Sequence, residues 1–194
     1  MALRTLLAGL LVALLATASP DVTRRWVPAP DKSAVEFTAT HPLGDFRGRA
    51  EGVTGEFQAD PADLKAGVTG VLRIRVPALR TGDVGRDRDM RKLLEADKHP
   101  EIRYTVSAVE GSFNSMTPSA DVLLTIKGGI FLRGVERPLT FLGRARLRDD
   151  RVWVRGESRL RLTDFGMTPP SRLFLKMGDE VLVSFDLTLE HHQD

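Results

Sequence analysis

Apolar and polar residues alternate over several long stretches of this 194-residue chain. In residues 152–162, the clearest case, Val152, Val154, Leu160 and Leu162 share one side, while Trp153 and charged residues take the other. A period of two places successive side chains on opposite faces, so each stretch predicts a β-strand with one apolar and one polar face. The same pattern recurs in residues 33–41, 71–76, 102–108, 122–126, 139–147 and 181–190.

Turn signals such as Asp149-Asp150 and Gly178-Asp179 separate these stretches. Strands of this kind form antiparallel sheets with one face in water. When one domain contains many of them, a sandwich or a closed barrel buries the apolar faces, and closure leaves no exposed edge. We therefore expect an all-β fold, an antiparallel barrel with one short helix. The residues expected on its inner wall are Val35, Phe37, Ala39, Leu72, Ile74, Tyr104, Val106, Leu124, Ile126, Phe141, Val152, Val154, Leu160, Leu162, Phe185 and Leu187.

The short helix is expected within the charged block RDRDMRKLLEADKHPEIRYTV, residues 86–106. Thr81 or Asp83 can cap its N-terminus. Pro100 disfavours helical geometry at the residue before it, so the helix should stop there and a strand begin. The apolar residues Met90, Leu93 and Leu94 have helical spacing and would close one end of the barrel, where they would also shape the mouth of a pore. The charges are interpreted as a solvated face of the helix.

The first 18 residues have the organisation of a signal peptide. Arg4 precedes the apolar run of residues 6–16, and Ala16-Thr17-Ala18 has the small-residue spacing of a cleavage site. The run is too short to span a bilayer as a helix, although an uncleaved anchor is the alternative. We expect cleavage before Ser19, a domain of residues 19–194 without a stable membrane span, and a periplasmic or secreted location.

The charge balance argues against nucleic-acid binding. Lys and Arg number 28 and Asp and Glu number 26, a net charge of only +2. Basic residues are interleaved with acids, whereas phosphate-binding surfaces need clustered, uncompensated Lys and Arg.

No catalytic or metal-binding motif is apparent in the sequence. The absence of cysteine excludes disulfides, thiolate nucleophiles and Cys-based metal sites. His41, His99, His191 and His192 lack the spacing of zinc ligands, and no nucleophile motif occurs. We therefore predict no catalytic residue, no metal and no cofactor, although paired carboxylates for glycosidic hydrolysis stay open.

Large and small residues are mixed on the predicted inner faces. Ala108, Gly143, Ala145 and Gly156 lie on the same faces as the large side chains. A barrel of about eight strands is either just filled by its side chains or holds one small ligand, and small inward residues favour the second case. Each methylene of a lipid moved into such an interior contributes about 0.8 kcal/mol before ordering costs.

An ordered set of motifs resembles the YceI-like family of exported, lipocalin-like, polyisoprenoid-binding proteins. Its most specific part is Thr81-Gly82, a charged Arg-Asp helix and then KHPEIRY, residues 98–104. The other matching segments are SAVEFTATH (33–41), LGDFRGR (43–49), GEFQAD (55–60), FLRGVERPLTF (131–141), DFGM (164–167) and GDEVLVSFDL (178–187). The family often has an aromatic pair where this chain has Leu93-Leu94.

The resemblance implies an extended antiparallel barrel whose pore holds an isoprenoid tail and which has no catalytic residues. The corresponding hypothesis is non-catalytic binding, sequestration or transport of a polyisoprenoid, an isoprenoid quinone or a related lipid. One alternative is an interaction module with a packed core that docks an acidic partner through Arg155, Arg159 and Arg161. Another is a secreted hydrolase that uses carboxylates or Tyr104 in the cavity. The sequence leaves a homodimer open.

Overall fold

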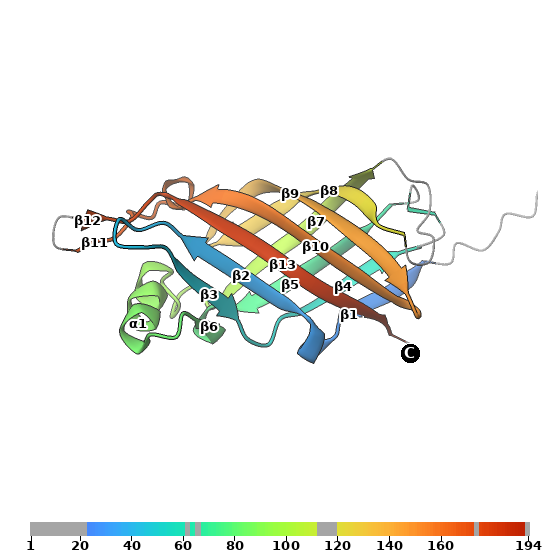
Figure 1. Cartoon of the computed structure of the whole chain (residues 1–194), viewed down its shortest axis with the longest axis horizontal. Helices are drawn as coiled ribbons and strands as arrows, with labels where there is room; N and C mark the ends of the chain where they lie inside the picture. Colours follow the sequence, from blue (N-terminus) through green and yellow to red (C-terminus); the bar gives the residue numbers. More distant parts are fainter. Residues whose placement is uncertain (1–22, 61–62, 65–66, 112–119, 173–174, 193–194) are drawn as a thin grey trace, which may run out of the picture.

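The alternating stretches form antiparallel strands that close into an elongated barrel (Figure 1). The computed structural model describes residues 23–60, 63–64, 67–111, 120–172 and 175–192. The expected signal peptide lies outside these residues. The strand pairing and the single described α-helix confirm the expected all-β antiparallel barrel with one short helix.

Strand β13 (Glu180–His191) closes the barrel, because both of its edges are paired with other strands. Along one edge it pairs with β10, and along the other it pairs first with β2 (Ala34–Ala39) and then with β1. From β2 the sheet continues into β3 (Phe46–Ala50) and β6 (Leu79–Arg80). The closed ring is β1 (Arg24–Pro28), β4 (Thr54–Ala59), β5 (Thr69–Arg75), β7 (Glu101–Gly111), β8 (Val122–Leu132), β9 (Val135–Arg148), β10 (Arg151–Arg161) and β13.

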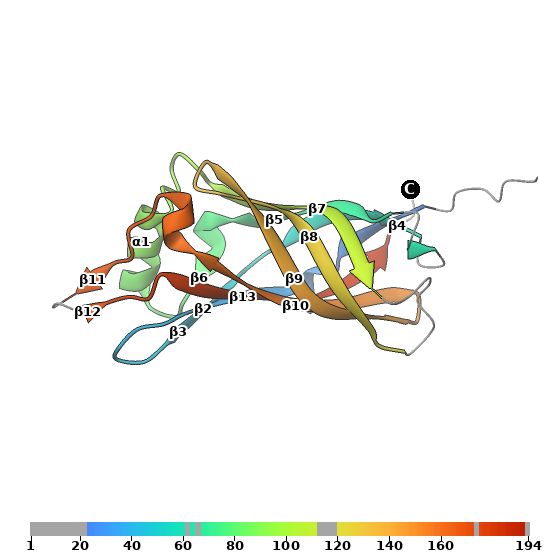
Figure 2. The same cartoon turned by 90° about the horizontal axis from the view of Figure 1, so that it is seen from above.

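The two ends of the barrel differ. Helix α1 (Val84–Leu93) and the hairpin of β11 (Ser171–Arg172) and β12 (Leu175–Lys176) lie at one end, which we call the helix end (Figures 1 and 2). The start of β1 and the end of β13 lie at the other, the terminus end. Short 3-10 helices occur at Pro30–Lys32, Val76–Ala78 and Leu162–Phe165.

A β-bulge in β7 changes which side chains point inward. The register with β8 shifts between Val106 and Ala108. An extra residue in one strand reverses the alternation beyond it. The expectation that Ala108 shares the inner face with Val106 is therefore wrong, and Val109 faces the interior instead.

Helix α1 begins as one of the two sequence alternatives predicted. Asp83 is the N-cap, and its carboxylate accepts a hydrogen bond from the amide of Arg86 at 2.7 Å. Thr81 has another role: its amide and hydroxyl donate to Asp87 at 2.8 and 2.6 Å. Asp87 is only 5% exposed, so the interpretation of all the helix charges as solvated is wrong for this residue.

The helix ends at Leu93, earlier than Pro100 requires. Glu95 adopts a left-handed conformation (φ 49°), its amide donates to Lys92, and the amide of Ala96 donates to Arg91 at 3.0 Å. This is the hydrogen-bond pattern of a Schellman motif, which ends a helix without proline. Glycine normally occupies the left-handed position, so a glutamate there indicates a compensating contact.

That compensating contact is an ion pair between Glu95 and Arg133. Arg133 is itself left-handed (φ 50°) and forms the β8–β9 turn with Gly134 (φ 77°). Its guanidinium also donates to the carbonyl of Gly166 at 2.7 Å. Arg133 therefore joins the end of α1, the β8–β9 turn and the segment after β10 at the helix end of the barrel.

Replacing Asp87 with alanine should destabilise the protein by about 2 kcal/mol, because the half-buried amide and hydroxyl of Thr81 would lose their charged acceptor. Chemical denaturation measures the change. Asp89→Asn in the same helix is the control: its side chain is 66% exposed, so the expected change is within about 0.5 kcal/mol. Equal effects of the two substitutions would contradict the role given to Asp87.

Replacing Glu95 with glutamine should lower the melting temperature at neutral pH but not at acid pH. Hydrogen bonds from Lys98 and Arg133 hold the pKa of Glu95 below its usual value of 4.5. A lowered folded-state pKa gives a stabilisation that is complete above the unfolded-state pKa and is lost as the pH falls through the folded-state pKa. Thermal unfolding of the wild type and of Glu95→Gln, measured from neutral to acid pH, tests the prediction.

The control for Glu95→Gln is the same substitution in an Arg133→Gln background, where the difference should shrink. A difference that is independent of pH, or that is unchanged without Arg133, would show that the ion pair does not anchor the helix.

Candidate ligand-binding cavity

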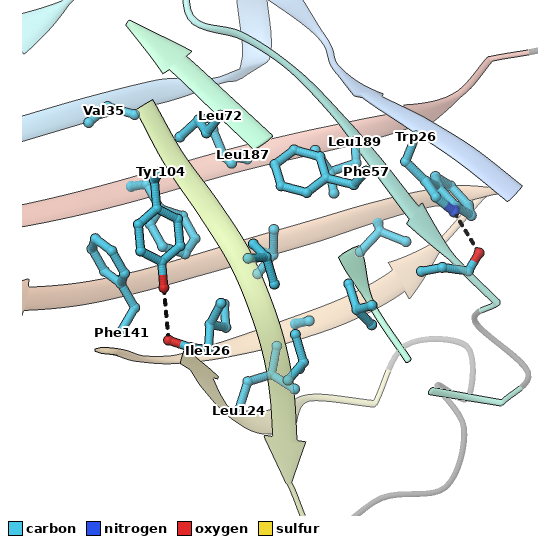
Figure 3. Close-up of a pocket in the computed structure, with 18 of the residues that line it drawn as sticks. Trp26, Val35, Phe57, Leu72, Tyr104, Leu124, Ile126, Phe141, Leu187 and Leu189 are labelled. Carbon is cyan, nitrogen blue, oxygen red and sulfur yellow. Dashed lines mark hydrogen bonds between the residues drawn. The ribbon is translucent and has the colours of Figure 1, made fainter. Parts of the chain in front are cut away.

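A cavity of about 140 Å³ lies inside the barrel (Figure 3). An engineered apolar cavity of about 150 Å³ stays dry and binds benzene, so a volume of this size accommodates hydrocarbon. Side chains from β1, β2, β4, β5, β7, β8, β9, β10 and β13 line it, together with the β4–β5 connection. The lining residues are Trp26, Val35, Phe57, Ala59, Leu64, Val68, Leu72, Ile74, Ile102, Tyr104, Val106, Val109, Leu124, Ile126, Ile130, Phe141, Ala145, Val152, Val154, Val183, Phe185, Leu187 and Leu189.

Most of the residues expected on the inner wall do line the cavity. Strand alternation identified them because the inner face of a closed barrel is continuous from one strand to the next. They are Val35, Leu72, Ile74, Tyr104, Val106, Leu124, Ile126, Phe141, Val152, Val154, Phe185 and Leu187. That they bind a ligand remains a prediction.

The other expected wall residues lie outside the cavity lining. Ala39, Leu160 and Leu162 are buried in the core at the helix end. β10 ends at Arg161, so Leu162 belongs to the 3-10 helix that follows and not to the wall. Phe37 packs against Gly48, where a Cβ atom would come within 2.2 Å of its ring. Alternation gave the inward direction of these residues but not their depth along the barrel.

The helix residues also lie away from the cavity. Leu94 is buried, and Met90 and Leu93 pack against the core. Helix α1 lies at the helix end of the barrel, and none of the three residues lines the cavity. That this helix shapes the mouth of a pore stays a prediction.

The sequence did not predict that residues at the terminus end line the cavity. Trp26 is the main example. Its indole is 2% exposed and donates a hydrogen bond to the carbonyl of Ala59 at 3.2 Å. β1 is short, so it carries little alternation, and Leu64 and Val68 lie outside any strand. In contrast, Ile102, Val183 and Leu189 were on faces identified as apolar and could have been included.

Three aromatic rings meet edge to face toward the helix end of the cavity. The ring centroids of Tyr104 and Phe141 are 5.0 Å apart, and those of Phe141 and Phe185 are 5.1 Å apart. The Tyr104 hydroxyl lies 3.1 Å from the carbonyl oxygen of Ile126 and 3.0 Å from that of Leu139, so its proton is shared between two main-chain acceptors. Burial raises the pKa of Tyr104 to about 12, so the phenol is neutral at physiological pH.

Two glycines make room for these rings. A Cβ atom at Gly128 would lie 2.7 Å from Cζ of Tyr104, and one at Gly156 would lie 2.9 Å from Cζ of Phe185. Real Cβ atoms essentially never approach so closely, so larger residues at either position would displace a ring. Gly156, one of the small residues that the sequence placed on the inner faces, therefore accommodates an aromatic side chain.

The cavity offers no free polar side chain to a ligand. Among its lining residues only Trp26 and Tyr104 carry polar side-chain atoms, and both are hydrogen-bonded to main-chain carbonyls. A ligand hydroxyl or carbonyl would lose its hydrogen bonds to water without replacement, at a cost of about 1–3 kcal/mol. The site is therefore suited to hydrocarbon.

The cavity lining contains few side chains that could take part in catalysis. No carboxylate or histidine is among the residues lining the cavity. Within the described residues, no cluster of three or more His, Asp or Glu is arranged to hold a metal ion. No helix among the residues that the structure describes is long and apolar enough to cross a membrane.

Several solved structures share this fold. BcnA from Burkholderia cenocepacia superimposes with a TM-score of 0.68 over 83% of this chain and 98% of its own, at 15% identity. A polyisoprenoid-binding domain from Saccharophagus degradans, implicated in plant cell wall breakdown, gives 0.68 over 88% and 99%, at 17% identity. A YceI protein from Campylobacter jejuni gives 0.61 over 76% and 85%, at 14% identity. The superpositions show a common fold, and at sequence identities this low they show the fold alone.

None of the curated proteins compared with the chain matches it. The sequence model of the YceI-like domain, in contrast, matches residues 26–189, which span every strand of the closed ring. This match confirms the family expected from the sequence motifs. The chain belongs to the YceI-like family.

Proposed function

We propose that this protein binds the hydrocarbon chain of a polyisoprenoid, an isoprenoid quinone or a related lipid inside the barrel, without transforming it. The observation that carries the proposal is the cavity wall, on which both polar side-chain groups are already bonded to the main chain. A structural relative from Saccharophagus degradans is described as a polyisoprenoid-binding domain, which supports this class of ligand.

The cavity volume limits which part of the lipid is inside. About 140 Å³ matches a short piece of hydrocarbon and not a whole polyisoprenoid. We propose that the inner end of the tail occupies the cavity, while the head group and the rest of the chain extend from the terminus end. A polar head outside the barrel keeps its hydrogen bonds to water.

We further propose that the protein acts after export, in the periplasm or outside the cell, where it would sequester or carry the lipid. The proposal rests on the signal-peptide organisation of residues 1–18.

The two alternatives are less well supported. A packed-core interaction module does not account for the cavity, and two of its three docking arginines have intramolecular contacts: Arg159 pairs with Glu180 at 3.5 Å, and Arg155 lies 5.7 Å from the Trp153 ring. A hydrolase would need ionisable groups in the cavity. Its candidate Tyr104 is neutral and hydrogen-bonded to the main chain.

The first test is native mass spectrometry of the mature protein purified from its own cell envelope, followed by organic extraction. We expect an equimolar adduct that extracts as an isoprenoid lipid. The adduct should be lost when Ala145, 2% exposed and lining the cavity, is replaced with leucine, which fills the space. A wild-type protein that carries no adduct and takes up no added prenyl alcohol would refute the proposal.

A second test uses the position of the tryptophans. The chain has two, Trp26 in the cavity wall and Trp153, whose indole donates to Asp186 at 2.6 Å on the outer face. In a Trp153→Phe variant, farnesol should change the emission of Trp26 in a saturable titration. In a Trp26→Phe variant, the emission of Trp153 should not respond. Equal responses would place the ligand elsewhere.

A further inference from the structure

Three aromatic rings border the cavity partway along its length. The rings of Tyr104, Phe141 and Phe185, which we call the aromatic waist, meet edge to face with centroids 5.0 and 5.1 Å apart. On β13, Val183 lies next to Phe185 toward the helix end and Leu187 lies next to it toward the terminus end, and both line the cavity. Lining residues also flank Tyr104 on both sides along β7 (Figure 3). The cavity therefore continues past the waist in both directions.

The two outer rings of the waist occupy space that neighbouring strands leave empty. Gly156 pairs with Phe185 on one side and with Gly143 on the other, so two adjacent inner positions of the wall have no side chain. The Phe185 ring fills part of this space, because a Cβ atom at Gly156 would lie 2.9 Å from its Cζ and 3.1 Å from its Cε1. The Tyr104 ring lies in the same way against Gly128 of β8, where a Cβ atom would lie 2.7 Å from its Cζ.

The two glycines supply space and not an unusual backbone conformation, since neither Gly128 nor Gly156 has a positive φ. Ordinary van der Waals contact with a Cβ atom begins at 3.4 Å. An alanine at position 156 would therefore push the Phe185 ring away from the wall and toward Phe141, which is 4% exposed and packs between the outer rings. The width of the cavity at the waist thus depends on what the wall carries behind each ring.

We propose that Gly128 and Gly156 determine the width of apolar chain that the cavity accepts, because they let Tyr104 and Phe185 lie against the wall. The inference rests on the proposed binding function and adds a specificity determinant to it. Isoprenoid chains carry methyl branches, so they are wider than straight alkyl chains of the same length. Each branch that an apolar site accommodates strengthens binding by about fourfold in Kd, and a branch that is excluded adds nothing.

The experiment measures Kd for alcohols of different width, by displacement of a fluorescent fatty alcohol from the full mature protein. The alcohols are dodecanol, farnesol with its double bonds reduced, which has the same main chain with methyl branches, and an alkanol of similar length that ends in a cyclohexyl ring. The quantity compared is the Kd of each wider alcohol relative to that of dodecanol, since this ratio cancels a general loss of affinity. The wild type should bind reduced farnesol at least about tenfold more tightly than dodecanol.

Gly156→Ala should lower the preference for reduced farnesol over dodecanol by at least about fourfold, because the displaced ring narrows the waist. It is chosen over Gly128→Ala, since a Cβ atom at Gly128 would also lie 2.3 Å from the carbonyl oxygen of Thr105.

Phe185→Leu tests the waist even where Gly156→Ala does not fold. It removes a ring, so the cyclohexyl alcohol should gain at least about fourfold in affinity relative to dodecanol. Adding Gly156→Ala to this variant should leave the preference for reduced farnesol unchanged, because the ring that the alanine would displace is absent.

Gly129→Ala is the matched control, because it adds the same methyl group to the outer face of β8, where a Cβ atom would meet the exposed side chain of Glu136. Both ratios should keep their wild-type values. A wild type that binds none of the alcohols would overturn the proposed function and this inference with it. A wild type that binds dodecanol as tightly as reduced farnesol, or ratios that Gly156→Ala and Phe185→Leu leave unchanged, would overturn the role of the glycines alone and leave the binding function intact.

Discussion

The fold depends on the pairing of β13 with strands on both of its edges. β10 covers one edge along its whole register, and β2 and then β1 cover the other. Without the contact between β1 and β13, the apolar inner faces would form an open sheet with unpaired edges, which is an aggregation hazard. Closure turns those faces into a common interior, so the cavity exists only because the first and last strands of the described chain meet.

The interior of the barrel has a packed part and a hollow part. Toward the helix end it is solid, with Phe165 and Met167 almost fully buried beneath the loops that Arg133 joins. Toward the terminus end it is hollow and lined by apolar side chains. Packing at the first end stabilises the barrel, which allows the second end to leave volume unfilled despite the cost of a cavity.

The sequence predicted the fold class and most of the cavity wall, because both follow from alternation that is local in the chain. It did not predict three features that depend on the whole barrel. The bulge in β7 moved Val109 into the wall in place of Ala108. Depth along the barrel placed Leu160 in the core and Phe37 against it, and the pairing of β1 with β4 brings Trp26 beside Ala59. Periodicity gives the direction of a side chain, whereas depth depends on how far each strand is displaced along its neighbours.

Several of the motifs that identified the family meet at the helix end. Thr81 bonds to Asp87, Glu95 precedes KHPEIRY, Arg133 lies within FLRGVERPLTF and Gly166 within DFGM, and these residues contact one another around α1. Other motifs supply the cavity wall: GEFQAD contributes Phe57 and Ala59, and GDEVLVSFDL contributes Phe185.

The order of the strands along the chain also affects how the protein can fold. A barrel closed by its last strand cannot assemble while that strand is still being synthesised, and contacts between distant parts of a chain form slowly. The same register that encloses the cavity therefore postpones completion of the barrel until β13 is available to pair with both β10 and β1.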